Sequence, residues 1–160
     1  MKKLLSIIGC LVCLSAAAQN QATLETATVG GEKMVILPTY NNLIKLSAID
    51  SAQMDTFLQK YGYEQEGTAG NFSSGDDNFD VDKRSKEVDV MFEVKTDYFS
   101  ALRDDIKKRF PNAVPTTKNA YGATTDTYII AWNDAKGQHV QQLSITDDTT
   151  SSSVSLKLLK

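Results

Sequence analysis

The sequence predicts an α+β domain: an antiparallel β-sheet with two amphipathic helices packed on one face. Two segments place apolar residues at helical spacing, and several others alternate apolar and polar residues as half-buried strands do. The order of a helix followed by strands recurs in residues 47–95 and 96–160, after an N-terminal hairpin unit at 19–46. This recurrence suggests an α-β-β duplication, although no residue-level repeat accompanies it.

Residues 1–18 have the pattern of a signal peptide. A short positive start precedes the apolar run Leu4–Leu14, which is too short to span a bilayer, and small residues follow it. We expect cleavage after Ala18 and export of residues 19–160 as a single α+β domain to the periplasm, the cell surface or the medium of a bacterium. No later segment predicts an integral membrane span.

A lipoprotein signal is the alternative, because Ile7-Ile8-Gly9-Cys10 loosely resembles a lipobox. If cleavage instead follows Ala18, both cysteines of the chain, Cys10 and Cys13, leave with the signal. The exported domain then has no disulfide, no thiol nucleophile and no thiolate metal site.

The charge balance narrows the class of partner. The chain has 17 Lys and Arg against 20 Asp and Glu, a net charge of −3, and loss of the signal makes it more acidic. Proteins that bind nucleic acid or anionic membrane surfaces present basic faces, so the composition argues against both partners. Another protein is the expected partner, with a polysaccharide as the alternative.

The N-terminal unit is predicted to begin with a hairpin. Thr23–Leu37 contains two short apolar stretches on either side of Gly30-Gly31, a dipeptide typical of a tight turn. Pro38 should end the second strand, and Asn41-Asn42 indicates a loop after it.

The first helix has local signals at both ends. Asp50 is a suitable N-cap, with Gln53 in the capping-box position, and Gly62 stands where a left-handed C-terminal cap belongs. Its apolar stripe consists of Met54, Phe57, Leu58 and Tyr61.

The segment 63–86 is rich in Gly, Ser and Asp, and we expect a short strand followed by a long loop. Residues 87–94 alternate in polarity and predict a half-buried strand. Thr96 should cap a second helix that Pro111 stops. Its apolar face consists of Phe99, Leu102, Ile106 and Phe110.

The remainder predicts a meander of three strands, through Tyr128–Trp132, His139–Ile145 and Val154–Leu158, with turns at 133–137 and 147–152. The first of these strands is apolar on both faces. We therefore expect it to be central in the sheet and covered on both sides.

The second helix ends in Phe110-Pro111-Asn112-Ala113, and Gly137 lies in a turn between the two strands that follow. Over about 97–149, a third of the chain, this arrangement resembles PepSY-like secreted bacterial domains. The resemblance implies a non-enzymatic binding protein, since the PepSY-like fold is similar to that of small exported hydrolase inhibitors.

One motif matches the oxygen-ligand spacing of a calcium loop: Asp76-x-Asn78-x-Asp80-x-Asp82, with Glu87 at the twelfth position. Val81 stands at the sixth position, where the sharp turn needs glycine, and Lys83 stands at the eighth. We therefore expect a solvated loop over 76–87 and no calcium or other metal.

The sequence offers no catalytic constellation. His139 is the only histidine and lies beside a turn, so we expect an exposed strand residue and not a general base. The nucleophile elbow, zincin, P-loop and dinucleotide motifs are all missing. A pair of carboxylates would suffice for a glycosidase, but a domain of this size leaves little room for a substrate cleft. We expect neither enzyme activity nor a cofactor.

Tyr128, Ile130 and Trp132 share one face of their strand. An exposed aromatic row would stack on sugar rings or anchor a partner protein, but such rows are more often core. We expect Trp132 to be buried, with its indole N–H bonded to a carbonyl near the turn at 133–137.

We expect the protein to be an exported, non-enzymatic binding module. In the more specific version of this hypothesis, it is a PepSY-like inhibitor of another protein. The alternatives are a polysaccharide-binding module that uses the aromatic strand face and a calcium-stabilised structural protein.

Overall fold

The computed structural model describes residues 23–29, 33–67, 70–74, 79–92 and 97–159. Several sequence predictions fall outside these ranges. They are the signal peptide with its cleavage after Ala18, the Gly30-Gly31 turn, the Thr96 cap, and the first residues of the acidic motif.

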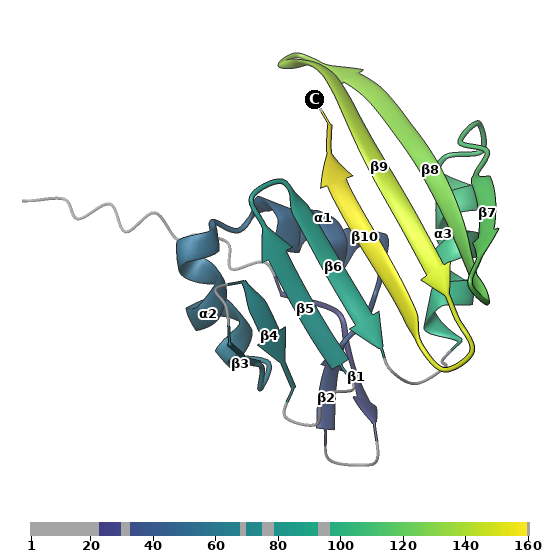
Figure 1. The fold of residues 1–160 in the computed structure, drawn as a ribbon. Coiled ribbons are helices and arrows are strands. Elements are labelled where there is room, and N and C mark those ends of the chain that lie inside the picture. The colour runs from purple at the N-terminus through teal and green to yellow at the C-terminus, as the bar shows by residue number, and fades with distance from the viewer. Residues whose placement is uncertain (1–22, 30–32, 68–69, 75–78, 93–96, 160) are drawn as a thin grey trace, which may run out of the picture.

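The α+β class is confirmed (Figure 1). The main sheet is eight-stranded and antiparallel, in the order β3-β4-β5-β6-β10-β9-β8-β7, and β1 and β2 form a separate hairpin. The helices are α1 (Tyr40–Ala48), α2 (Ser51–Gln59) and α3 (Tyr98–Arg109). The strands are β1 (Thr26–Val29), β2 (Lys33–Ile36), β3 (Glu64–Gln65), β4 (Asn71–Ser73), β5 (Phe79–Arg84), β6 (Glu87–Phe92), β7 (Thr116–Ala120), β8 (Ala123–Asp134), β9 (Gly137–Asp147) and β10 (Ser152–Leu158).

Both halves of the chain have the same order of elements. In the first half α2 is followed by the four-stranded meander β3–β6, and in the second half α3 is followed by the meander β7–β10. The last strand of each half, β6 or β10, lies at the centre, and the two pair antiparallel. Within the described residues the helices number three, not the predicted two, and none has the length and apolar content that a membrane crossing requires.

The additional helix, α1, corrects the prediction of a loop at Asn41-Asn42. Thr39 caps α1, since its hydroxyl accepts a hydrogen bond from the backbone N–H of Asn42 at 3.2 Å. The Asn42 side chain is fully buried and bonds to the N–H and C=O of Glu25 and to the C=O of Leu37. Asn42, which the sequence analysis assigned to a loop, therefore links the segments on either side of the β1–β2 hairpin to α1.

Helix α2 begins and ends where the sequence predicts. The Asp50 carboxylate accepts a hydrogen bond from the backbone N–H of Ala52 at 2.9 Å. At the other end, Gly62 adopts a left-handed φ of 79°, and Tyr63 N–H bonds to Leu58 C=O at 3.3 Å. These are features of a Schellman C-cap, which favours glycine because no Cβ opposes a positive φ.

The segment 63–86 was predicted as a short strand followed by a long loop, but its described part contains three strands, β3, β4 and β5, so the long loop is wrong there. β5 alternates as a strand should, with Phe79, Val81 and Lys83 facing the helices. Lys83 interrupts the apolar pattern, yet its side chain is only 5% exposed. Its ammonium group donates to Ser47 C=O at 2.8 Å, at the C-terminal end of α1 where a cation is favoured.

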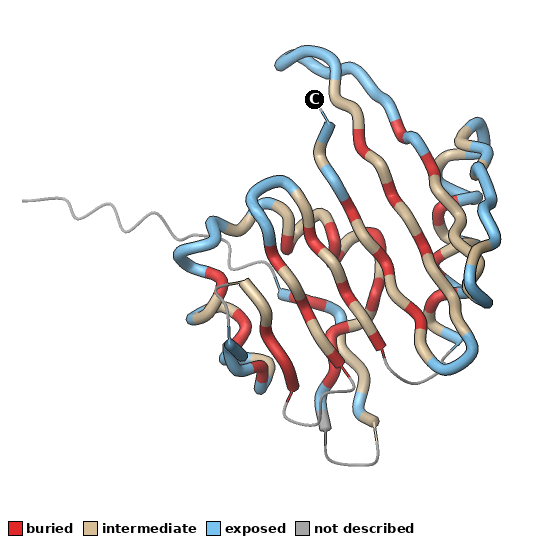
Figure 2. Tube along the Cα trace, in the orientation of Figure 1, coloured by how far each residue is buried: buried red, intermediate tan, exposed pale blue. Residues whose placement is uncertain are grey.

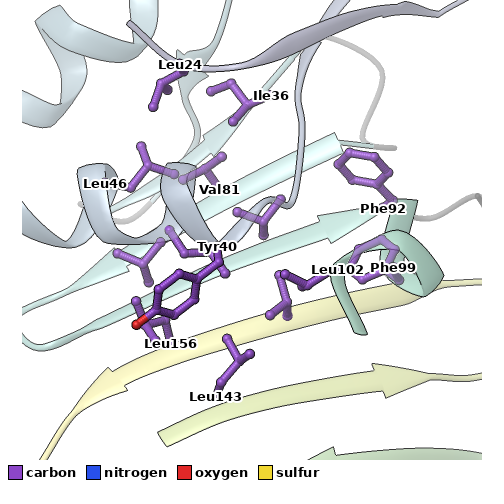
Figure 3. Close-up of a cluster of buried hydrophobic side chains, with 14 of the residues drawn as sticks. Leu24, Ile36, Tyr40, Leu46, Val81, Phe92, Phe99, Leu102, Leu143 and Leu156 are labelled. Atoms are coloured by element: carbon purple, nitrogen blue, oxygen red, sulfur yellow. The ribbon is translucent and has the colours of Figure 1, made fainter. Parts of the chain in front are cut away.

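The hydrophobic core lies between the sheet and the helices, and every strand from β4 to β6 and from β8 to β10 contributes to it (Figures 2 and 3). Phe99, Leu102 and Ile106 form the buried face of α3, as predicted, while Phe110 is partly buried. Asp97 occupies the N-cap position of α3 without a side-chain hydrogen bond.

A strand that the sequence analysis missed, β7, forms the edge of the sheet beside β8. Arg103 of α3 joins this side of the sheet to the helix layer, with its guanidinium 2.9 Å from Asp126 and 2.5 Å from Asp147. A hydrogen bond from the Thr117 hydroxyl, together with Arg103, holds the pKa of Asp126 below its usual value.

Candidate functional site: the helix-free face of the sheet

The helices and the β1–β2 hairpin lie on one side of the main sheet, and no element of the described residues covers the other side (Figure 1). We call this other side the helix-free face. Its residues alternate along the strands with the buried ones (Figure 2). Asp, Ser and Thr are frequent among them. Across the centre they include Asp82, Asp89, Ser155, Ser144 and Thr127, each opposite the next on adjacent strands.

Four carboxylates gather on the β5–β6 part of this face, at Asp80, Asp82, Glu87 and Asp89. We call this group the acidic patch. Asp82 and Asp89 lie directly opposite each other in the antiparallel pair, where like charges are unfavourable. Positive charge offsets part of this repulsion, since Arg84 lies 2.6 Å from Asp82 and Lys157 lies 3.5 Å from Glu87.

The electrostatic environment of Asp89 disfavours its ionised form. Its partial burial raises the pKa of its carboxyl group, a hydrogen bond with Ser155 opposes this shift, and the negative charges of Glu87 and Asp82 add to it. The raised pKa means that the ionised form of Asp89 is less stable in the folded chain than in the unfolded chain.

A hollow of about 670 Å³ lies over the acidic patch. Asn71, Met91 and Ser153 border it beside Asp80, Asp82 and Asp89, and so does Arg84, whose guanidinium pairs with Asp82. The three carboxylates outnumber this one cation, so the lining keeps an acidic character that suits an ammonium or guanidinium group with an apolar stem.

Replacing Asp89 with asparagine should stabilise the fold. Removal of the charge opposite Asp82 should raise the free energy of unfolding at neutral pH by about 0.5 kcal/mol, within the range for one cross-strand pair. In thermal unfolding this corresponds to about 2 °C. Below about pH 4 the gain should disappear, because the Asp89 carboxyl of the wild type is then neutral as well.

Asp104→Asn on the exposed side of α3 is the matched control and should leave the melting temperature unchanged. A lower melting temperature for Asp89→Asn at neutral pH would contradict the electrostatic argument.

The rest of the helix-free face is rich in hydroxyl groups. Thr125 and Thr146 are hydrogen-bonded across β8 and β9 at 3.0 Å, and Thr127 and Ser144 at 3.3 Å. These short side chains give the face a low relief that another macromolecular surface can approach closely.

The structure corrects the prediction for Trp132. Its side chain is not buried but 37% exposed, on the part of β8 and β9 that extends beyond the helices (Figure 1). The indole stacks on the ring of His139 with centroids 5.1 Å apart and planes at 15°. Tyr128 is core, at 5% exposure, so Tyr128 and Trp132 do not form an exposed aromatic row.

β8 is also not the central strand that its apolar faces predicted. It is second from the edge, and Ile129 and Ala131 are exposed on the helix-free face. His139 faces the opposite side, with its Nε2 atom 2.9 Å from the Asp134 carboxylate. This pair lies near the hairpin end, and no serine nucleophile is hydrogen-bonded to His139 in the described chain.

The calcium motif does not form one loop over its described residues. Asp80 and Asp82 belong to β5 and Glu87 to β6, whereas Val81 and Lys83 face the helices. No three His, Cys, Asp or Glu side chains of the described chain converge in a group that could hold a metal ion. The absence of a calcium site therefore stays a prediction, to be tested by melting with calcium and with chelator.

Comparison of the chain with protein-family models, curated proteins and solved structures finds no match. The resemblance of 97–149 to PepSY-like domains therefore remains a hypothesis from the residues alone.

Proposed function

We propose that the chain is an exported, non-enzymatic binding protein whose helix-free face docks on a basic surface of another protein. The observation that carries the proposal is the placement of Asp82 directly opposite Asp89, beside Asp80 and Glu87. Like charges directly opposite each other cost stability, and a partner that brings further positive charge to this part of the sheet would reduce that cost.

The surroundings of the acidic patch support a macromolecular partner. The hydroxyl side chains next to it provide hydrogen-bond donors and acceptors on the three strands β8, β9 and β10, and short side chains of this kind lose little entropy on binding. The PepSY-like resemblance points in the same direction, because it implies a binding protein and not an enzyme.

The test compares two triple variants with the same change in charge. Asp80→Asn/Asp82→Asn/Asp89→Asn neutralises the acidic patch, and Asp55→Asn/Asp97→Asn/Asp104→Asn neutralises carboxylates on α2 and α3. Tagged wild type and control should retain the same crosslinked partner from the envelope fraction of producing cells, and the acidic-patch variant should retain at least about tenfold less.

The contact should also weaken as salt is raised, because its charged groups are exposed. Equal retention by both triple variants, each with wild-type circular dichroism, would reject the helix-free face as the binding surface.

A polysaccharide remains the second candidate, because Trp132 is exposed beside a hollow of about 280 Å³ that Lys86, His139 and Leu158 help to form. One ring with polar neighbours is a minimal sugar platform. Co-sedimentation with insoluble cell-wall polysaccharide that Trp132→Ala abolishes, and that the acidic-patch variant keeps, would favour this candidate over a protein partner.

A further inference from the structure

The outer edge of β8 is unpaired over the second half of the strand. β9 pairs with β8 along its whole length, whereas the pairing with β7 stops at Thr127, which lies opposite Thr116. Residues 128–134 therefore present an edge of about 23 Å that no described strand covers. It belongs to the part of the sheet that extends past the helices in Figure 1.

The turn that precedes β8 shows which backbone N–H and C=O groups of the edge point away from β9. β7 and β8 are joined at Tyr121-Gly122, with φ angles of 52° and 85°, and such two-residue turns are flanked by a hydrogen-bonded pair. Hydrogen bonding to a given neighbour then recurs at every second residue. The N–H and C=O groups of Ile129, Ala131 and Asn133 therefore point outward, and in the described chain they have no hydrogen-bond partner.

The edge has few of the features that usually protect a strand from pairing. The register between β8 and β9 runs without a bulge, residues 128–134 contain no proline, and their one charged residue, Asp134, lies at the end of the edge. Ile129 is 52% exposed on the helix-free face, and Trp132 is partly exposed on the opposite face. An unprotected edge that is apolar on both faces is a site for strand addition.

We propose that this edge pairs antiparallel with the same edge of a second copy of the chain, around a twofold axis at Ala131. In this register Ala131 lies opposite Ala131 of the second copy, and Ile129 lies opposite Asn133 of the second copy. Each outward-facing residue thus meets another outward-facing residue. An axis at Ile129 would instead place Ala131 opposite Thr127, which β7 already occupies.

The side chains and the two ends of the edge fit the same register. Trp132 lies opposite Ile130 of the second copy, an aromatic–β-branched pair, and Asp134 lies opposite Tyr128, so no like charges meet. The pairing ends where β8 turns into β9 and where β7 begins. Seven residues from each copy bury less than the roughly 1,200 Å² of a stable interface, so the dimer is weak and depends on concentration.

Disulfide crosslinking tests the register directly, in a Cys10→Ser/Cys13→Ser background. Ala131→Cys should form covalent dimers under mild oxidation, because hydrogen-bonded antiparallel pairs place their Cα atoms about 5.5 Å apart, within disulfide range. Asn133→Cys alone should not, because the two cysteines would be about 13 Å apart along the strands. Ile129→Cys mixed with Asn133→Cys should give heterodimers. Equal crosslinking of Ala131→Cys and Asn133→Cys would overturn the proposed register.

Analytical ultracentrifugation of the purified protein tests the association itself. The wild type should dimerise at concentrations of about 0.1 mM, and Ile129→Lys and Ala131→Pro should each weaken the dimer at least about tenfold. Proline at 131 removes only an outward-facing N–H, so the β8–β9 ladder should persist. Met34→Lys, a change of the same kind on the distant hairpin, should leave the dimer intact.

A wild type that stays monomeric at about 1 mM would overturn the proposal, as would a dimer that both edge variants leave unchanged. Neither result bears on the acidic patch, because the patch lies on β5 and β6 and the edge on β8.

Discussion

Phe92→Ala should lower the free energy of unfolding by about 3–5 kcal/mol, which is the usual cost of removing a buried phenylalanine ring. Phe92 is fully buried at the end of β6. Its ring makes edge-to-face contacts with Phe79 at 4.9 Å, Phe99 at 5.5 Å and Tyr98 at 6.0 Å between centroids. Figure 3 shows Phe92 next to Phe99. The substitution therefore opens a cavity between β5, β6 and α3 at once.

Urea denaturation followed by circular dichroism measures this loss. Phe57→Ala is the control, because Phe57 is only partly buried on α2, and its cost should be markedly smaller. Phe92→Leu should recover most of the stability, since it refills most of the cavity. A cost for Phe92→Ala below about 1.5 kcal/mol would mean that the core relaxes around the missing ring.

Asn42→Ala should lower the free energy of unfolding by about 3 kcal/mol, because it leaves partly buried backbone groups of Glu25 and Leu37 without their hydrogen bonds. The neighbouring Asn41→Ala is the matched control. Asn41 makes its side-chain bonds at the surface, to Glu25 and Arg109, and its loss should cost less than about 0.5 kcal/mol.

Thermal and urea unfolding of the two alanine variants measure the two losses of stability. Similar stabilities for both would show that water replaces the Asn42 bonds and that the hairpin does not depend on them.

The two asparagines also show why part of the fold could not be predicted from the sequence. Helix α2 has its cap, its apolar stripe and its terminal glycine within thirteen consecutive positions, so local signals alone define it. The polar pair at the start of α1 is typical of a loop. Only the hairpin packed beside it, which supplies partners for Asn42, makes a buried asparagine favourable in a helix.

The strand β5 was missed because the Gly, Ser and Asp content of 63–86 is typical of a loop. Lys83 also interrupts its apolar pattern, and the sequence does not reveal that the C-terminal end of α1 lies within reach of the ammonium group. Trp132 is the converse case. Its apolar strand predicts burial, but the helices end before they cover that part of β8.

The candidate site was not predictable from the sequence, because it depends on the register between strands. Asp80 and Asp82 were noticed as members of a calcium pattern and Asp89 only as the polar half of an alternation. The pairing of Asp82 with Asp89 follows from the β5–β6 register, which is a tertiary property. The one available signal was a pair of acidic residues two positions apart in each of two successive strands, Asp80 with Asp82 and Glu87 with Asp89.

The central position of β10 has a consequence for how the chain folds. β10 is the last strand of the chain, yet it lies between β6 and β9 and joins the two meanders. Each meander forms from neighbouring segments, but the two meanders are joined by the pairing of β6 with β10, which lie far apart in the sequence. Contacts of such high sequence separation close late and slowly. The edges of β6 and β9 therefore stay exposed until β10 pairs between them and joins the two half-sheets.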